Sequence, residues 1–129
     1  MLKAVLFDLD GTLVDSSEGI LNASREALAS LNISGVTDED IKSCIGPPIG
    51  ESLGRFLDFT ESQKREFYDV FRPLYRDRYL FQCAVYPGIE SLIKELKGRG
   101  LSVGVVTNKK KDSTSLLLDR LGWQICSMS

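Results

Sequence analysis

Two stretches of the chain are apolar over several consecutive positions and then end abruptly in polar side chains. The first covers residues 2–7, with Lys3 as its one polar break, and the second covers residues 101–106. Four to eight apolar residues closed by a turn signal predict a strand that is buried on both faces, as in a parallel sheet covered by helices. We therefore expect two adjacent parallel strands, over about residues 3–8 and 101–107.

Between these strands the apolar residues recur at helical spacing, and no stretch from residue 16 to about residue 82 predicts a strand. The expected helices run from Ser16 or Ser17 to about Leu31, from Thr37 to before Gly46, from Glu51 to Leu57, from Thr60 onward with a bend or break at Pro73, from Ile89 to about Lys97, and from a cap at Asp112 or Ser113 to Leu121. Thr60 and Gln63 have the spacing of a capping box.

This order of elements predicts an α/β fold with a helical insertion. We assign residues 1–15 and 83–129 to an α/β core domain and residues 16–82 to a helical domain inserted into it. The tail from Trp123 onward shows no strand pattern, so the predicted sheet has only two strands and is incomplete, whereas a stable sheet generally needs three. The bare apolar edge of the first strand invites pairing with another chain.

Composition narrows the function. The sequence has a formal net charge of −2, which gives no reason to expect nucleic acid or an anionic membrane as a partner. No apolar run approaches the roughly 20 residues of a membrane span, and no leader pattern precedes the first strand, so we expect a cytoplasmic protein. The sequence contains no histidine, which excludes histidine-based nucleophile activation and histidine metal ligands.

Asp8 and Asp10 carry the first candidate chemistry. They lie at the carboxyl end of the first predicted strand, the edge at which parallel sheets bind ligands. Two carboxylates this close repel each other unless a cation or a shared proton relieves them, and Mg²⁺ is the usual cation for hard oxygen ligands. The alternative is a plain turn, because aspartate and glycine are common turn residues.

Thr107 and Asn108 repeat this arrangement at the end of the second predicted strand. A hydroxyl, an amide and exposed backbone N–H groups beside a helix N-terminus can hold phosphate oxygens. On their own these two residues would be interpreted as a helix cap, and pairing with Asp8 favours the functional interpretation. The run Lys109-Lys110-Lys111 could attract a phosphate, although such runs more often form a solvated surface.

Asp8-Leu9-Asp10-Gly11-Thr12 resembles the first signature of the haloacid dehalogenase superfamily of phosphohydrolases. Thr107-Asn108-Lys109 is similar to the second signature in its phosphoglycolate phosphatase-like branch. The resemblance implies a Rossmannoid parallel sheet with an inserted all-helical cap. It also implies a magnesium-dependent phosphatase that acts on a small phosphorylated metabolite, with phosphoglycolate as the leading substrate.

The resemblance also implies a role for each matched residue. Asp8 would attack phosphorus and form an aspartyl-phosphate, and Asp10 would act as general acid and then as general base. Mg²⁺ would bind the Asp8 side chain and the Asp10 backbone carbonyl. Five further residues would bind the phosphate group of the substrate: Gly11, Thr12, Thr107, Asn108 and Lys109.

The sequence departs from the superfamily pattern after Asn108, because neither the expected lysine signature nor the later metal-binding acids follow. Three hypotheses stay open. The chain is the N-terminal part of a phosphatase, or a non-catalytic remnant that acts as a binding or interaction module, or one member of an assembly, such as a homo-oligomer, in which a second chain completes the sheet. We expect the 129 residues alone to show little or no phosphatase activity, even with saturating Mg²⁺.

Overall fold

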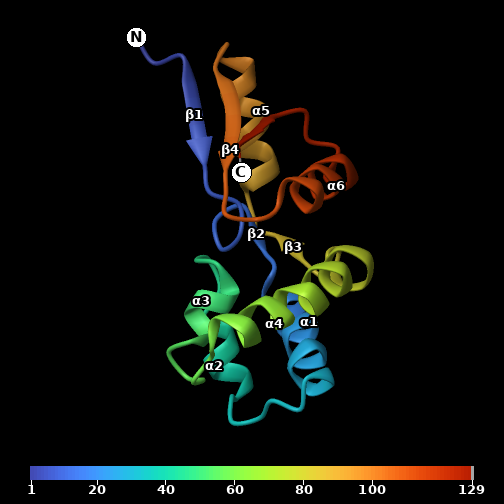
Figure 1. Ribbon diagram of the computed structural model, residues 1–129. Helices are drawn as coiled ribbons and strands as arrows, with labels where there is room; N and C mark the ends of the chain where they lie inside the picture. Colours follow the sequence, from blue (N-terminus) through green and yellow to red (C-terminus); the bar gives the residue numbers. More distant parts are fainter. Residues whose placement is uncertain (129) are drawn as a thin grey trace. The chain divides into compact units, whose positions relative to one another are not determined.

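The computed structural model describes residues 1–128 and divides the chain into two compact units (Figure 1). One unit joins Met1–Asp15 to the chain from Ala84 onward, and the other is Ser16–Cys83. The first unit is built on a parallel sheet of three strands, β1 (Ala4–Phe7), β4 (Ser102–Val106) and β5 (Cys126–Met128), in the order β1-β4-β5. The register pairs Phe7 with Val105, so both polar loops leave the same edge of the sheet.

The two predicted strands and their parallel pairing are confirmed. The expectation that the tail contributes no strand is wrong, because β5 pairs in parallel with β4 and aligns Val105 with Ser127. Its sequence gives a weak signal: three residues with a serine in the middle have neither a clear alternation nor an apolar run. This segment becomes a strand because it pairs with the free edge of β4. Strand propensity depends strongly on such context.

The structure also contains a second, two-stranded sheet that the sequence pattern does not predict. β2 (Val14–Asp15) and β3 (Ala84–Val85) pair antiparallel, and the Tyr86 N–H extends the pairing by donating to the Leu13 carbonyl at 3.1 Å. Each strand has only two residues, which is too short for a periodic pattern to appear. In agreement with the prediction, no described residue from 16 to 82 is in a strand.

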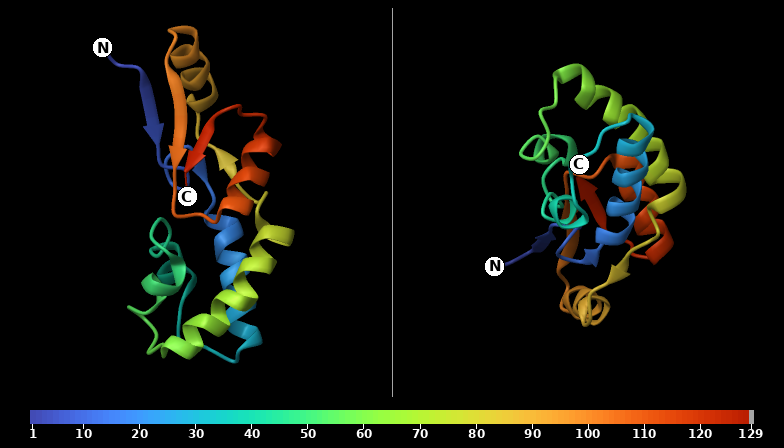
Figure 2. Two further views of the ribbon diagram at one scale, coloured as in Figure 1. Left: turned by 45° about the horizontal axis from the view of Figure 1, so that its top comes forward. Right: turned by 90° about the horizontal axis from the view of Figure 1, so that it is seen from below.

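Helices α5 (Ile89–Gly98) and α6 (Lys111–Leu121) pack against β4 and β5 respectively (Figures 1 and 2). The strand order advances in one direction, so two right-handed crossovers place both helices on one face of the sheet. The burial agrees, since Val103 and Val105 are buried whereas Val106 is exposed. Gly122 ends α6 in a left-handed conformation.

The predicted cap of α6 is wrong. Lys110 occupies the N-cap position, and the helix begins at Lys111 rather than after Asp112 or Ser113. The Asp112 carboxylate accepts the N–H of the adjacent Ser113 at 2.8 Å. Thr114 donates its hydroxyl to the Lys110 carbonyl at 2.9 Å and, with 0% exposure, fixes this first turn against the core.

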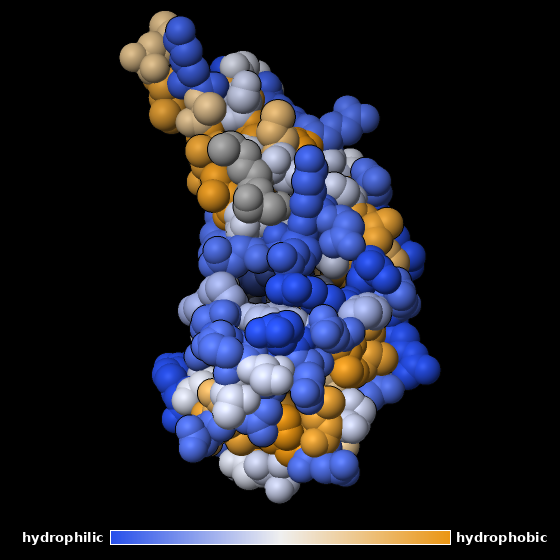
Figure 3. All heavy atoms as spheres, viewed as in Figure 1, coloured by the Kyte–Doolittle hydropathy of each residue, from blue (hydrophilic) through white to orange (hydrophobic). Residues whose placement is uncertain are grey.

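The face of the sheet opposite the two helices is apolar and open. Leu6 is 62% exposed and Val106 is 46% exposed. β1 is an edge strand of the described sheet, and apolar atoms are visible at the surface around it in Figure 3. Pairing of this edge with a second chain stays a prediction.

The second unit contains only helices among its described residues. They are α1 (Ser17–Ser30), α2 (Asp38–Lys42), α3 (Ile49–Leu53), α4 (Glu61–Leu74) and a π-helix, η1 (Tyr75–Tyr79). Thr60 and Gln63 form the predicted capping box, and Thr37 and Asp40 form a second one. The helix expected over residues 51–57 is shifted: α3 starts at Ile49 and ends at Leu53, because Pro48 serves as its N-cap.

The predicted interruption at Pro73 takes the form of a change of helix type. Proline removes one backbone donor and clashes with the preceding turn, and α4 gives way to the π-helix two residues later. The apolar side of α4 is an aromatic row in which Phe67, Phe71 and Tyr75 stack with ring centroids 5.3 and 5.6 Å apart. All three are buried and belong to the core of this unit.

Tyr68 of α4, whose ring meets Phe67 edge-on, joins α4 to α3. Its hydroxyl accepts the Gly50 N–H at 2.8 Å and donates to the Glu51 carboxylate at 2.7 Å. A Cβ at Gly50 would lie 2.6 Å from the tyrosine ring, so any larger residue there would force the ring to move. Burial and the hydrogen bond to Glu51 raise the pKa of Tyr68 to about 12. No helix that the structure describes is both long and apolar enough to cross a membrane.

Candidate active site

The loop after β1 is folded around one backbone carbonyl. The Leu9 carbonyl accepts the N–H groups of Thr12, Leu13 and Val14 at 3.0–3.2 Å. The Leu9 and Leu13 side chains have no exposed surface, which anchors the loop to the core. Asp8 and Asp10 flank Leu9 and lie on the polar side of the loop, Asp8 exposed and the Asp10 side chain 12% exposed.

Gly11 permits this loop. Its φ is +80°, a left-handed conformation that costs an L-residue on the order of 1–2 kcal/mol, and its N–H donates to the Val14 carbonyl at 2.8 Å. The turn closes directly after Asp10, and the Asp8 carboxylate accepts the Leu9 N–H at 2.8 Å. Thr12, the next predicted site residue, is exposed on the same turn.

The loop after β4 is also held by a hydrogen bond within it. Thr107, which is only 7% exposed, accepts the N–H of Lys109 at its hydroxyl oxygen at 3.1 Å. The chain therefore turns at the exposed Asn108 before α6 begins. The prediction that Thr107 and Asn108 follow a buried strand and precede a helix N-terminus is confirmed.

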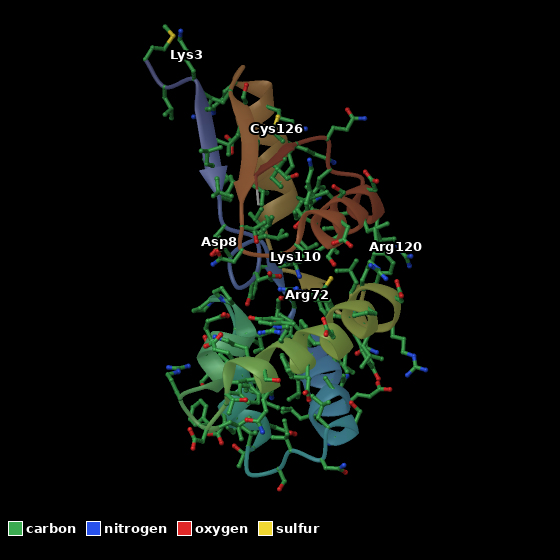
Figure 4. All side chains as sticks on the ribbon, viewed as in Figure 1. Lys3, Asp8, Arg72, Lys110, Arg120 and Cys126 are labelled. Carbon is green, nitrogen blue, oxygen red and sulfur yellow. The ribbon has the colours of Figure 1, made fainter. Side chains whose placement is uncertain are left out.

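An ion pair connects the two loops. Lys109 Nζ lies 3.2 Å from Asp10 Oδ1, and the lysine side chain is only 4% exposed. In Figure 4, Asp8 and Lys110 lie at this same edge of the sheet, where the loops after β1 and β4 meet. The structure thus brings an acid from the first motif together with a cation from the second. The sequence suggested that Lys109 could meet phosphate, and it contained no signal for a pairing with Asp10.

The two loops offer oxygen atoms, which are the type of ligand that a hard cation prefers. Asp8 and Asp10 offer carboxylate and carbonyl oxygens, and Mg²⁺ is usually held by one or two carboxylates together with waters and substrate phosphate. Within residues 1–128, no cluster of three or more acidic, cysteine or histidine side chains could hold a metal ion. Asp8 and Asp10 would therefore suit a cation that keeps most of its other ligands from water and substrate.

A sequence model of a family described as haloacid dehalogenase-like hydrolase matches residues 5–126, which includes both loops. The chain belongs to the haloacid dehalogenase-like hydrolase family. Phosphatases of this family are generally metal-dependent. The match ends at Cys126, the first residue of β5, so it includes part of the C-terminal segment that the sequence pattern did not connect with the family.

Relatives of this haloacid dehalogenase-like chain are named as phosphatases. It is 34% identical over 131 residues to a phosphoglycolate phosphatase from Rhodospirillum rubrum, covering 95% of this chain and 54% of the relative. It is 36% identical over 105 residues to a 5'-nucleotidase from Pseudomonas aeruginosa, covering 81% of this chain and 48% of the relative. The chain thus spans about half the length of these curated relatives.

Solved structures show the same fold. The crystal structure of a predicted phosphatase from Clostridium acetobutylicum superposes on this chain with a TM-score of 0.89 at 29% identity. The match covers 100% of this chain and 62% of that one. The sequence-based prediction of a haloacid dehalogenase-like fold is confirmed, including its parallel sheet.

Proposed function

We propose that this chain carries the nucleophile and the general acid/base of a magnesium-dependent phosphatase that hydrolyses a small phosphate monoester. The observation that supports this most strongly is the meeting of Asp10 and Lys109 at the carboxyl edge of the sheet, next to Asp8. Family membership supports the same reaction class, because the matched relatives are named as phosphatases.

In the proposed first step, an Asp8 carboxylate oxygen attacks phosphorus while the bond from phosphorus to the ester oxygen breaks. Asp10 protonates that leaving oxygen, and the phosphoryl group stays on Asp8. In the second step Asp10 takes a proton from water, which attacks phosphorus and releases Asp8 and phosphate. The hydrogen bonds to the Leu9 carbonyl hold the backbone of the loop that carries both acids, which supports this division of roles.

The phosphate group is assigned to the polar groups of the two loops. These are the residues expected from the sequence: Gly11, Thr12, Thr107, Asn108 and Lys109. Mg²⁺, held by the Asp8 carboxylate and the Asp10 carbonyl, would neutralise the charge that phosphoryl transfer spreads over the phosphate oxygens. We assign the helical residues 16–82 to a cap domain that selects the substrate.

Phosphoglycolate is the leading substrate, on the resemblance of Thr107-Asn108-Lys109 to that branch and on the relative from Rhodospirillum rubrum. A nucleoside monophosphate is the main competitor, since another relative is named a 5'-nucleotidase. We expect turnover by the 129-residue chain to be slow, because its described residues provide two acids at the site and no third. Loss of one electrostatic group can reduce a rate on the order of a hundredfold or more.

A substrate panel tests the proposal. Phosphoglycolate, a nucleoside monophosphate, a sugar phosphate and pyrophosphate are each incubated with the chain and MgCl₂, and released phosphate is measured against Asp8→Asn as the blank. We expect slow release that depends on Asp8 and is greatest for phosphoglycolate. Release that is equal in Asp8→Asn, or hydrolysis confined to substrates without phosphate, would contradict the proposed function.

A further inference from the structure

Lys109 differs from the two lysines that follow it. Lys110 and Lys111 are exposed, whereas the Lys109 side chain is 4% exposed and its ammonium group lies 3.2 Å from the Asp10 carboxylate. Lysines are almost never fully buried without a partner, because removing the charge from water is costly. The ion pair with Asp10 offsets part of the cost of this position.

Both ends of Lys109 are held. Its backbone N–H donates to the Thr107 hydroxyl, and Thr107 is itself buried directly after β4. At the other end its Nζ is paired with Asp10, whose neighbour Leu9 is fixed in the core with no exposed surface. The position of the ammonium group is therefore determined by two anchored strand ends and not by a freely moving side chain.

Asp8 and Asp10 are two residues apart at the end of one strand, and their like charges repel. In the structure the Lys109 ammonium group contacts one of these two acids, Asp10. We infer that Lys109 is a built-in counter-ion of the Asp8–Asp10 pair, which holds the Asp10 carboxylate in position before a metal ion binds and weakens the affinity of the pair for divalent cations. This inference deepens the proposed function and rests on it, because it concerns the same two acids.

Two consequences follow from the charges. Without the ammonium group the two acids repel each other, and the almost buried Asp10 loses a partner, so the metal-free chain becomes less stable. A divalent cation that approaches Asp8 and Asp10 then no longer competes with the Lys109 ammonium group, so it binds more tightly. Lys109 is in this sense a positioning residue for Asp10, whatever contact it also makes with phosphate.

Lys109→Met and Lys110→Met test the inference as a matched pair, because each removes one positive charge from the same loop. Thermal unfolding is measured without metal, and Mg²⁺ binding is measured by titration calorimetry on the 129-residue chain. We expect Lys109→Met to unfold roughly 5 °C or more below Lys110→Met and to bind Mg²⁺ on the order of tenfold more tightly than the unsubstituted chain. Lys109→Arg should restore both values.

The counter-ion role is overturned if Lys109→Met and Lys110→Met unfold at the same temperature without metal, or if Lys109→Met binds Mg²⁺ more weakly than Lys110→Met. A different measurement, Mg²⁺ binding by Asp8→Asn, tests the proposed function. If Asp8→Asn binds Mg²⁺ as the unsubstituted chain does, the two acids do not form the metal site. The unfolding comparison without metal still decides the role of Lys109 in that case.

Discussion

Lys109 and Asp10 form an ion pair of 3.2 Å between the loops that follow two neighbouring parallel strands. The residues are almost a hundred positions apart in the sequence, and the pairing of β1 with β4 brings them together. The pair brings the two sequence motifs into contact at one edge of the sheet. It also gives the acid pair of the first motif a positive neighbour that belongs to the chain itself.

Gly11→Ala should destabilise the core unit by about 1–2 kcal/mol, because Gly11 has a φ of +80° that a Cβ disfavours, although nothing lies within 4 Å of the added atom. Gly98→Ala is the matched control. Gly98 also has space around it but lies in α5 without a positive φ, so alanine there should be neutral or stabilising. Urea unfolding of both variants measures the difference. Equal stabilities would show that the loop can form without the left-handed residue.

Thr60→Ala should lower the free energy of unfolding by about 1 kcal/mol, because it removes the side chain that accepts the Gln63 N–H at 3.1 Å. Thr60→Ser keeps an oxygen at this position and should lose much less. Chemical denaturation followed by circular dichroism measures both variants. A Thr60→Ser variant as unstable as Thr60→Ala would mean that the methyl group, and not the cap, stabilises α4.

Tyr68→Phe should destabilise the helical unit at neutral pH, because it removes hydrogen bonds to Gly50 and Glu51. The pKa of Tyr68 is raised to about 12, mainly by burial and then by the bond to Glu51. Folding therefore favours the protonated phenol. Its contribution to stability is fully present below the unfolded pKa of about 10 and is lost as the pH rises through about 12.

The stability difference between the original chain and Tyr68→Phe should consequently shrink between pH 10 and pH 12. Comparing the two proteins at each pH cancels the titration of the lysines that they share. A difference that stays constant over this interval would show that Tyr68 does not gain protonation on folding.

Asp10→Asn should reduce turnover strongly but leave some capture of the phosphoryl group on Asp8, because an amide cannot protonate the leaving oxygen or activate water. Asp8→Asn should abolish both, since an amide cannot form the acyl phosphate. Phosphate release and covalent labelling, measured side by side, separate the two effects. Labelling that disappears equally in both variants would contradict the division of roles between the two acids.

Much of the fold could be predicted from the chain because the signals were local. The apolar runs before Asp8 and Thr107 indicated β1 and β4, and Thr60 with Gln63 indicated the start of α4. β5 could not be predicted in this way, because the segment Cys126–Met128 becomes a strand through its pairing with β4. The two-residue strands β2 and β3 were too short to give a pattern.

The sequence predicted those residues of the candidate site that directly follow a strand. The spacing of Asp8 and Asp10 and the position of Thr107 placed the acids and the hydroxyl on one edge of the sheet. The resemblance assigned Lys109 to phosphate binding, but its pairing with Asp10 could not be predicted, because a contact between residues so far apart leaves no local pattern in the sequence. In the structure the Thr107 hydroxyl accepts the Lys109 N–H, and the Lys109 side chain pairs with Asp10.

Covalent labelling of Asp8 tests the central claim most directly. The 129-residue chain is incubated with a reactive phosphoryl donor such as acetyl phosphate and MgCl₂, quenched in acid and digested, and the modified residue is located by mass spectrometry. We predict one added phosphoryl group on Asp8, retained at least in part in Asp10→Asn and missing in Asp8→Asn. A chain that takes up no phosphoryl group, or carries it on a residue other than Asp8, would contradict the proposed function.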